Sequence, residues 1–351
     1  MNTVRVRGEV VRRFIIEHVE KHPADIAKVV SEKFGITRQA ANKHIQNLVL
    51  EKALIPDGKT RGRSYGLAPL LSWKKTYLIN AGVTEDQIWM GDIAPSLGQM
   101  PKNVTDIWHY GFTEMFNNAI DHSGGQILEV QFEKTAVKTE IVIIDDGVGI
   151  FKKIQAALGL LDERHSVLEL AKGKLTTDPA RHSGEGIFFT SRMFDDYWIL
   201  SGGVYFSHEF GKKEDWILEP HKPTQGTVVC MKLNNHTARS TKKIFDQFTS
   251  DEDYGFNKTI VPVKLTKYGD DNLVSRSQAK RLISRVEKFK TVIFDFRDVD
   301  AIGQAFADEV FRVFAIQHPT IELIDIHANP TVSEMISRAR SNLKSYKASL
   351  G

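Results

Sequence analysis

Cysteine is almost absent from the 351-residue chain, in which Cys230 is the only one. A single cysteine excludes an internal disulfide framework and a cysteine-rich zinc site, and it favours a reducing compartment. Long apolar runs are also missing. None approaches the roughly 20 residues that cross a bilayer, and residues 1–13 mix Arg and Glu where a signal peptide would have an apolar core. We therefore expect a cytoplasmic protein with no membrane partner.

The chain also lacks the low hydrophobicity and high charge of disordered proteins, since 41% of its residues are hydrophobic and 26% are charged. At roughly 150 residues per domain, its length predicts two or three domains. The net charge is only +3, but residues 1–66 contain thirteen Lys/Arg against seven Asp/Glu, and the remainder is mildly acidic. The basic end is the candidate for binding a polyanion.

Residues 1–70 are predicted to form a winged helix-turn-helix domain. Apolar spacing indicates helices over about 6–19, 23–34 and 38–49, with Thr37 as the N-cap of the third. Turn-forming residues at 57–63 predict a hairpin, the wing. In such a domain the third helix enters the major groove of double-stranded DNA and wing cations reach phosphates. The candidate DNA-binding residues are Arg38, Gln39, Asn42, Lys43, Lys59, Arg61 and Arg63. The alternative is a winged helix that binds protein. Residues 71–102 are expected to be a connector, with a helix over 72–80.

A helix predicted over 105–123 carries polar residues on one face. Glu114, Asn118 and Asp121 stand at positions i, i+4 and i+7, so their side chains share that face. Such oxygens can hold Mg²⁺ and leave a carboxylate to orient a nucleophile, although most such faces are simply solvated. His109 and His122 on the same helix are interpreted as local polar or packing residues.

Two glycine turns follow this helix. A strand over 140–144 ends in Asp145-Asp146-Gly147-Val148-Gly149, which places a carboxylate beside residues that let the backbone approach a flat ligand. Gly184-Glu185-Gly186 opens a further helix, whose backbone amides suit phosphate oxygens. Candidates for added countercharge are Lys172, Lys174 and Arg181. The residues between the two turns have few apolar anchors and are predicted to be mobile, and a strand over 226–233 closes the region.

In their order and spacing, these motifs over about residues 103–234 resemble the GHKL ATPase superfamily of gyrase, heat-shock chaperones, histidine kinases and MutL. The resemblance implies the Bergerat fold, a helix layer on a mixed sheet, with ATP and Mg²⁺ as cofactors. It implies that Asn118 ligates Mg²⁺ and that Glu114 acts as a base or positions water. Residues implied at the adenine are Asp145, Gly147, Gly149 and Thr227. Gly184 and Gly186 would lie under the phosphates, and residues 151–183 would form the ATP lid. His182 departs from the pattern, because the family usually has glycine there.

Residues 250–345 alternate between predicted strands and helices, which indicates an α/β layer with parallel pairing. Residues 292–302 resemble a strand and loop of the STAS domain of anti-sigma-factor antagonists. Partner GHKL kinases phosphorylate a serine in that domain, but Gly303-Gln304-Ala305 offers no hydroxyl here. We therefore expect a docking or regulatory surface for a protein partner, or a structural domain.

The sequence thus predicts a multidomain α/β protein: a winged helix (1–70), a connector (71–102), a GHKL domain (103–238) and a STAS-like domain (250–345). The favoured function is transcription regulation by a slow Mg²⁺-dependent ATPase whose nucleotide state controls binding of DNA or a partner protein. One alternative is an anti-sigma-like serine/threonine protein kinase acting on a separate partner, and another is a non-catalytic nucleotide-dependent scaffold. A sensor histidine kinase is disfavoured because residues 68–105 lack a His-Glu-x-x-x-Pro box.

Overall fold

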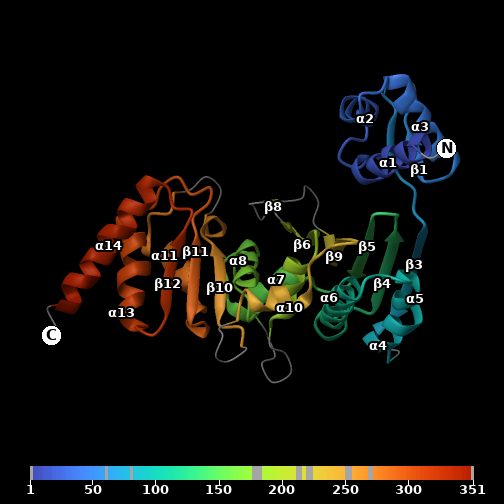
Figure 1. Ribbon diagram of the computed structural model, residues 1–351. Helices are drawn as coiled ribbons and strands as arrows, with labels where there is room; N and C mark the ends of the chain where they lie inside the picture. Colours follow the sequence, from blue (N-terminus) through green and yellow to red (C-terminus); the bar gives the residue numbers. More distant parts are fainter. Residues whose placement is uncertain are drawn as a thin grey trace.

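The computed structural model describes residues 3–59, 62–79, 82–175, 184–210, 216–218, 224–249, 255–267 and 272–348. These residues form a small helical unit, a central sheet with helices on one face, and a three-stranded sheet flanked by helices (Figure 1). The chain is therefore a multidomain α/β protein. Within the described ranges, every helix is too short or too polar to cross a membrane.

The N-terminal unit has the three helices and the hairpin that the sequence predicts. Its elements are α1 (Thr3–His18), α2 (Ile26–Phe34), α3 (Arg38–Leu50), β1 (Leu54–Asp57) and β2 (Ser64–Leu67). Thr37 caps α3, because its Oγ1 accepts a hydrogen bond from the Ala40 backbone N–H at 3.1 Å. Residues including Ile15, Val30 and Ile45 form a core separate from that of the rest of the chain.

The segment expected to be a connector supplies the edge strand of the central sheet. The helix predicted over 72–80 is wrong: β3 (Leu71–Leu78) pairs antiparallel with β4 along its whole length. The reason is a period of two, which brings Trp73 and Tyr77 to one face, where Trp73 stacks on Phe132 at 5.3 Å. The short helices that follow pack near α6: α4 (Glu85–Ile88), η3 (Trp89–Ile93) and α5 (Ala94–Leu97).

The central sheet has the strand order β3-β4-β5-β9-β6-β7-β8. The bounds are β4 (Ile127–Lys134), β5 (Lys138–Asp145), β6 (Asp196–Gly202), β7 (Val204–Glu209), β8 (Trp216–Leu218) and β9 (Thr224–Asn234). The GHKL resemblance implies a mixed sheet, but every pairing among the described strands is antiparallel. The pairs β4–β5 and β6–β7 are hairpins, and β9 returns between them. Strands β6, β7 and β8 have no counterpart among the strands predicted from the sequence.

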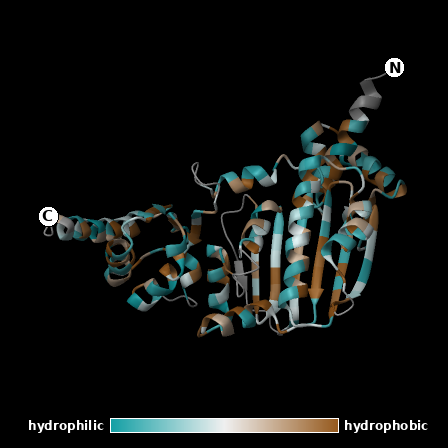
Figure 2. Ribbon diagram, turned by 90° about the horizontal axis from the view of Figure 1, so that it is seen from below, coloured by the Kyte–Doolittle hydropathy of each residue, from teal (hydrophilic) through white to brown (hydrophobic). Residues whose placement is uncertain are grey.

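A helix layer covers one face of this sheet. It contains α6 (Lys102–His122), α7 (Ile150–Leu158), α8 (Arg164–Lys172) and α9 (Gly186–Met193). Alternate β5 residues, from Thr139 to Asp145, are buried, and strands of the central sheet have apolar (brown) stretches in Figure 2. The prediction that residues 150–175 have few apolar anchors is wrong, because Phe151, Val167 and Leu168 are buried in the core. Their helical spacing indicates packed helices.

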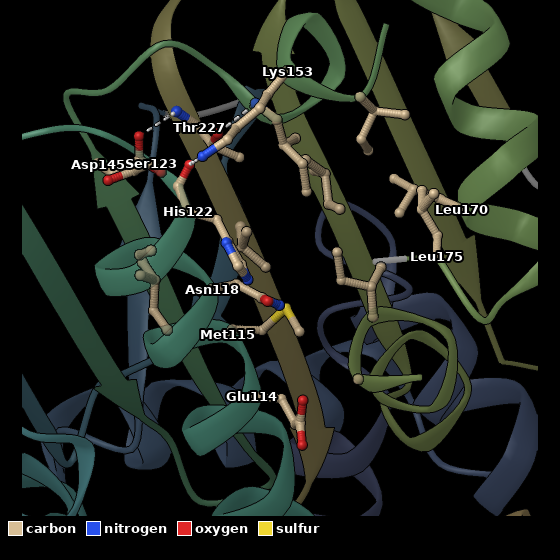
Figure 3. A pocket seen from close by; sticks show the side chains of 18 of the residues that line it. Glu114, Met115, Asn118, His122, Ser123, Asp145, Lys153, Leu170, Leu175 and Thr227 are labelled. Carbon is tan, nitrogen blue, oxygen red and sulfur yellow. Dashed lines mark hydrogen bonds between the residues drawn. The ribbon is translucent and has the colours of Figure 1, made fainter. Parts of the chain in front are cut away.

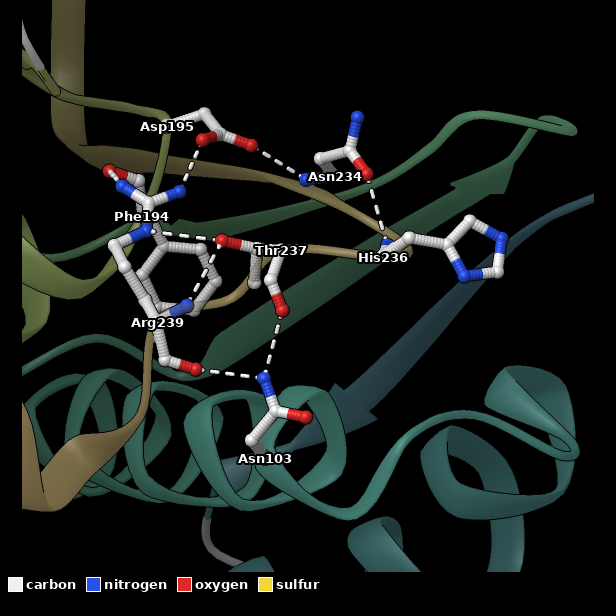
Figure 4. A network of polar contacts seen from close by, with 7 residues as sticks. All are labelled: Asn103, Phe194, Asp195, Asn234, His236, Thr237 and Arg239. Atoms are coloured by element: carbon white, nitrogen blue, oxygen red, sulfur yellow. Dashed lines mark hydrogen bonds and ion pairs between the residues drawn. The ribbon is translucent and has the colours of Figure 1, made fainter.

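The polypeptide that leaves β9 is tied to the central unit, although its polar composition resembles a linker. Asn103, near the start of α6, donates from Nδ2 to the carbonyl oxygens of Thr237 and Arg239 at 2.8 and 2.6 Å. The Arg239 guanidinium pairs with Asp195 and donates to the Phe194 carbonyl at 3.1 Å (Figure 4). The stretch is therefore fixed to the central unit through two of its backbone carbonyl groups and the Arg239 side chain.

The C-terminal unit has the predicted alternation of strands and helices. Its strands β10 (Lys258–Pro262), β11 (Thr291–Asp295) and β12 (Glu322–Ile326) are parallel and adjacent in that order. The helical segments are η4 (Val263–Thr266), α11 (Arg276–Ile283), η5 (Val286–Lys288), α12 (Gln304–Asp308), η6 (Glu309–Phe314), α13 (Ala315–Gln317) and α14 (Pro330–Ala348). The helix that precedes them in the chain, α10 (Thr241–Asp246), packs on α6 and α9 of the central unit. One hydrophobic core runs through this unit and the central unit, so the two form a continuous packed body.

Candidate functional site

A cavity of about 270 Å³ lies between the helix layer and the central sheet. It is lined by residues of α6, α7, α8, α9, β5 and β9, and Figure 3 shows their side chains converging from both layers. Six of the residues predicted from the sequence line it: Glu114, Asn118, Asp145, Gly184, Gly186 and Thr227. The fold thus brings together residues that are up to 113 positions apart in the chain.

Asp145 is fixed at one end of this pocket. Its Oδ1 accepts hydrogen bonds from the backbone N–H groups of Gly147 at 2.9 Å and Thr227 at 3.2 Å. Burial raises the pKa of the Asp145 carboxyl, and these two bonds together with the Thr227 hydroxyl oppose the rise. Because both backbone bonds go to Oδ1, they leave Oδ2 for other partners. The arrangement presents an oriented acceptor to a ligand that carries a donor group.

Thr227 stands directly opposite Asp145 in the β5–β9 pairing. Its Oγ1 accepts a hydrogen bond from the Ile150 N–H at 3.1 Å, which joins the sheet to the start of α7. Gly149 precedes that helix with φ of 96°, and a Cβ there would lie 2.7 Å from Ser201 Oγ. Glycine is required at this turn, because a side chain would have both a strained backbone and a clash.

Glu114 and Asn118 occupy successive turns of α6 at the other end of the pocket. The start of α9 approaches them closely, since a Cβ on Gly186 would lie only 2.0 Å from Glu114 Oε2. Tyr110 lies one turn before Glu114. Burial raises the pKa of the Tyr110 hydroxyl, and the charges of Glu114 and Glu185 raise it further. Burial also raises the pKa of Glu185, which Lys174 opposes. This end therefore gathers acidic groups beside a glycine turn.

The side-chain oxygens of Glu114 and Asn118 could bind a hard cation such as Mg²⁺ if a bound ligand supplied further oxygen atoms. The part of the chain that the structure describes has no cluster of three or more His, Cys, Asp or Glu residues that could hold a metal ion. Mg²⁺ commonly takes one or two protein oxygens and completes its shell with substrate phosphates and water. The donors at this end suit that mode, because Asn118 could supply an amide oxygen and Glu114 a carboxylate oxygen.

Two further pocket residues were not predicted to bind a ligand. Lys153, in α7, lines the pocket and donates from Nζ to the His122 carbonyl at 2.5 Å. His122, interpreted from the sequence as a local polar or packing residue, lines the same wall. Their positions in the sequence could have indicated a place in the pocket wall. Lys153 comes four residues after Gly149, and His122 comes four residues after Asn118. Each therefore lies about one helical turn beyond a motif residue.

The structure does not bring Lys172 and Lys174 to the pocket. The Lys172 side chain is fully buried and donates to Glu169 Oε1 at 2.7 Å and to two carbonyl oxygens of the C-terminal unit. Lys174 donates to the Lys288 carbonyl at 3.1 Å and lies over the Phe289 ring. The third predicted countercharge, Arg181, lies outside the described residues.

The predicted DNA-binding residues are exposed wherever the structure describes them. Arg38, Gln39, Asn42 and Lys43 lie on α3, and Lys59 and Arg63 lie beside the hairpin. Gln46 of α3 donates to the Tyr65 hydroxyl of β2 at 3.3 Å, and the Arg63 guanidinium lies over the Tyr65 ring at 5.6 Å. The helix and the hairpin therefore form adjoining basic surfaces. Arg61 lies outside the described residues.

Residues 278–333 match the family described as STAS-like domain of unknown function (DUF4325). The matched range runs from α11 to the start of α14 and includes β11 and β12. The C-terminal unit thus contains a STAS-like domain, as the resemblance of residues 292–302 predicts. A search of curated proteins gave no match to this chain.

Proposed function

We propose that the protein is an ATP-binding regulator whose central unit is a GHKL-type nucleotide switch. The observation that supports this most strongly is the convergence of Glu114, Asn118, Asp145 and Thr227 with the Gly186 turn in one cavity. Each belongs to a different motif or lies at a separate position along one helix. Binding of a single ligand would require these motifs to share a pocket, whereas motifs with separate structural roles would not be expected to line the same cavity.

In this proposal the adenine lies at the Asp145 end of the pocket. The ionised carboxylate accepts a hydrogen bond from the exocyclic amino group, and apolar residues such as Ile150, Ile154 and Val229 contact the ring. Lys153 adds a positive charge to the wall. The phosphates extend toward Asn118 and the Gly186 turn, where α9 begins and backbone N–H groups are unpaired by the helix.

Glu114 is the proposed base at the phosphate end. Its carboxylate lies against Gly186, where it can accept a proton from an attacking water or hydroxyl group. Mg²⁺ bound with ATP would neutralise charge on the phosphate oxygens, and Asn118 would hold it. Asp145 and Thr227 bind and orient, and Glu114 moves the proton.

The decisive experiment incubates pure protein with labelled ATP and Mg²⁺ and separates phosphate, ADP and phosphoprotein. Release of phosphate supports an ATPase. Transfer of label to a co-purified protein, lost in Asn118→Ala, would instead support the serine/threonine protein kinase. Absence of Mg²⁺-dependent ATP binding, with Asp145→Ala indistinguishable from the unsubstituted protein, would refute the nucleotide switch.

We further propose that the N-terminal unit is a winged helix that binds double-stranded DNA under control of the nucleotide. The exposed cations of α3 and the hairpin support the binding, and a direct contact with the central sheet supports the control. Lys138, at the start of β5, pairs with Glu20 at 2.8 Å, and neighbouring Val137 packs against the N-terminal core. The same strand ends at Asp145 in the pocket.

Duplex affinity measured in the apo, ADP and non-hydrolysable ATP-analogue forms tests this control. Nucleotide can shift the DNA affinity only if it binds the two arrangements of the units differently. Equal DNA affinity in all three forms would exclude the coupling.

A further inference from the structure

Helix α8 and the residues after it contact both the candidate pocket and the C-terminal unit. Leu170 and Leu175 line the pocket. Glu169 and Lys172, on the same helix, are 4% and 0% exposed and bond to the C-terminal unit instead. In Figure 1, α8 stands between α7 and β10, which agrees with this double role. Helix α8 therefore contributes one side to the pocket wall, while its other side is bonded to the C-terminal unit.

Lys172 is bonded to both units at once. Its Nζ donates to Glu169 Oε1 at 2.7 Å and to the backbone carbonyl oxygens of Arg281 and Ser284, both at 2.8 Å. These three bonds use every hydrogen of the ammonium group. The Lys172 carbonyl in turn accepts from Thr259 Oγ1, on β10, at 2.7 Å.

Arg285 completes the cluster from the C-terminal side. Its Nη1 donates to Glu169 Oε2 at 2.9 Å, and its Nη2 donates to the Lys174 carbonyl at 2.5 Å. The backbone of Arg285 has φ of 65°, a left-handed conformation that is costly for a residue with a side chain and persists where surrounding contacts hold it. Glu169 thus accepts from two cations, one on each side of the boundary.

The cluster fixes α8 against the C-terminal unit, because removal of any one of its charged side chains is expected to destabilise the fold. Taking away one partner of a buried ion pair leaves an uncompensated charge and is strongly destabilising, whereas replacing the pair together by neutral groups is often tolerated. The C-terminal unit, through Arg285 and the two carbonyl groups, therefore helps to fix the position of this helix.

We propose that Glu169, Lys172 and Arg285 are positioning residues for the nucleotide pocket, through which the STAS-like unit holds α8 so that Leu170 and Leu175 form the pocket wall. This inference rests on the proposed function of the pocket. It assigns the C-terminal unit a part in ligand binding that its own sequence does not suggest.

The test compares binding of a non-hydrolysable ATP analogue to full-length variants. Lys172→Met, which keeps the volume and removes the charge, is expected to weaken binding at least tenfold. Glu169→Gln combined with Lys172→Met is expected to weaken binding at least as much as Lys172→Met alone, because it also removes the carboxylate that pairs with Arg285. Arg285→Gln is a milder variant at a partly exposed side chain, expected to weaken binding about threefold.

Ile336→Ala is the control for a merely structural role. Ile336 is buried in the C-terminal core on α14, away from α8, so its truncation lowers the unfolding temperature without touching the cluster. Binding within twofold of the unsubstituted protein is expected. The proposal is overturned if Lys172→Met and Arg285→Gln bind within twofold as well, or if Ile336→Ala loses as much affinity at an equal loss of stability.

Hydrogen exchange of the α8 amides separates this inference from the proposed function. If the unsubstituted protein binds no ATP, the proposed function fails. Positioning is still supported if Arg285→Gln raises the exchange rate of α8 selectively over α6, and it is overturned if exchange of the two helices is unchanged.

Discussion

Substituting Asp145 by asparagine separates ligand recognition from stability at the candidate pocket. The two backbone N–H groups that hold Asp145 both donate to Oδ1, so an asparagine carbonyl oxygen can accept both. The group left for the ligand then changes from a charged acceptor to an NH₂ donor. Facing an adenine amino group, it would oppose one donor with another.

The expected loss of ATP affinity is about 100-fold. A hydrogen bond to a charged group contributes about 1.5–3 kcal/mol, and each 1.4 kcal/mol corresponds to about a tenfold change in affinity. Stability should not fall. Burial penalises the charged form of Asp145, and the asparagine removes that charge while keeping both backbone bonds.

Isothermal titration with ATP and thermal unfolding, each between pH 5 and 8, check both statements. Because burial raises the pKa of Asp145 in the folded state, ATP affinity of the unsubstituted protein should fall more steeply than that of Asp145→Asn as the pH falls toward that pKa. The part of the pH dependence that both proteins share comes from groups other than Asp145, among them the ATP phosphate. The folded carboxyl binds its proton more readily than the unfolded one, so its stabilising contribution is present at low pH and is lost as the pH rises through the folded pKa. At neutral pH the variant should therefore unfold at no lower a temperature. The reasoning is refuted if Asp145→Asn binds ATP normally, or if its affinity and unfolding temperature fall together.

Three further outcomes are expected. Glu114→Gln should keep ATP affinity within twofold and lower ATP turnover about 100-fold or more in a phosphate-release assay, because the proton acceptor is lost; unchanged turnover would remove Glu114 from the reaction. Gly186→Ala should lower turnover more than stability, since its Cβ would lie 2.0 Å from Glu114 Oε2 and must displace that carboxylate; full activity would contradict the close approach. Lys43→Ala should weaken binding to random duplex DNA and reduce the slope of log affinity against log salt by about one, whereas Lys28→Ala, exposed on α2, should not; equal effects would exclude α3 as the specific contact.

The elements with strong local signals could be predicted from the sequence. The three N-terminal helices, the Thr37 cap and the strand ending at Asp145 follow from periodicity and capping alone. The STAS-like unit was also predictable, because each of its strands is bounded by turns and followed by a helical pattern. Only the family resemblance predicted that the pocket residues lie close together, because a local sequence pattern does not indicate which turns are neighbours in the fold.

The errors arose where the tertiary environment decided. Residues 71–78 carry two lysines and end beside turn-forming residues, so their period of two is a weak signal, which pairing with β4 reinforces. Lys172 and Lys174 were assigned to phosphate by charge and proximity in sequence to Gly184. Both side chains instead point toward the C-terminal unit, which begins some 75 residues later in the chain. The residues around Lys172 and Lys174 carry no signal for that distant contact.

The central unit contacts both flanking units through elements that also line the pocket, which suggests why the three units share one chain. Strand β5 runs from the Lys138–Glu20 contact to Asp145, and α8 places Leu170 in the pocket wall and pairs through Glu169 with Arg285. A ligand that prefers one position of these elements must therefore bias contacts at both boundaries. Linkage makes the effect reciprocal: if ATP changes duplex affinity by some factor, saturating duplex must change ATP affinity by the same factor. In the proposed switch, a partner that binds the STAS-like unit and shifts Arg285 would act on the same pocket, so a change in nucleotide affinity would couple the two flanking units.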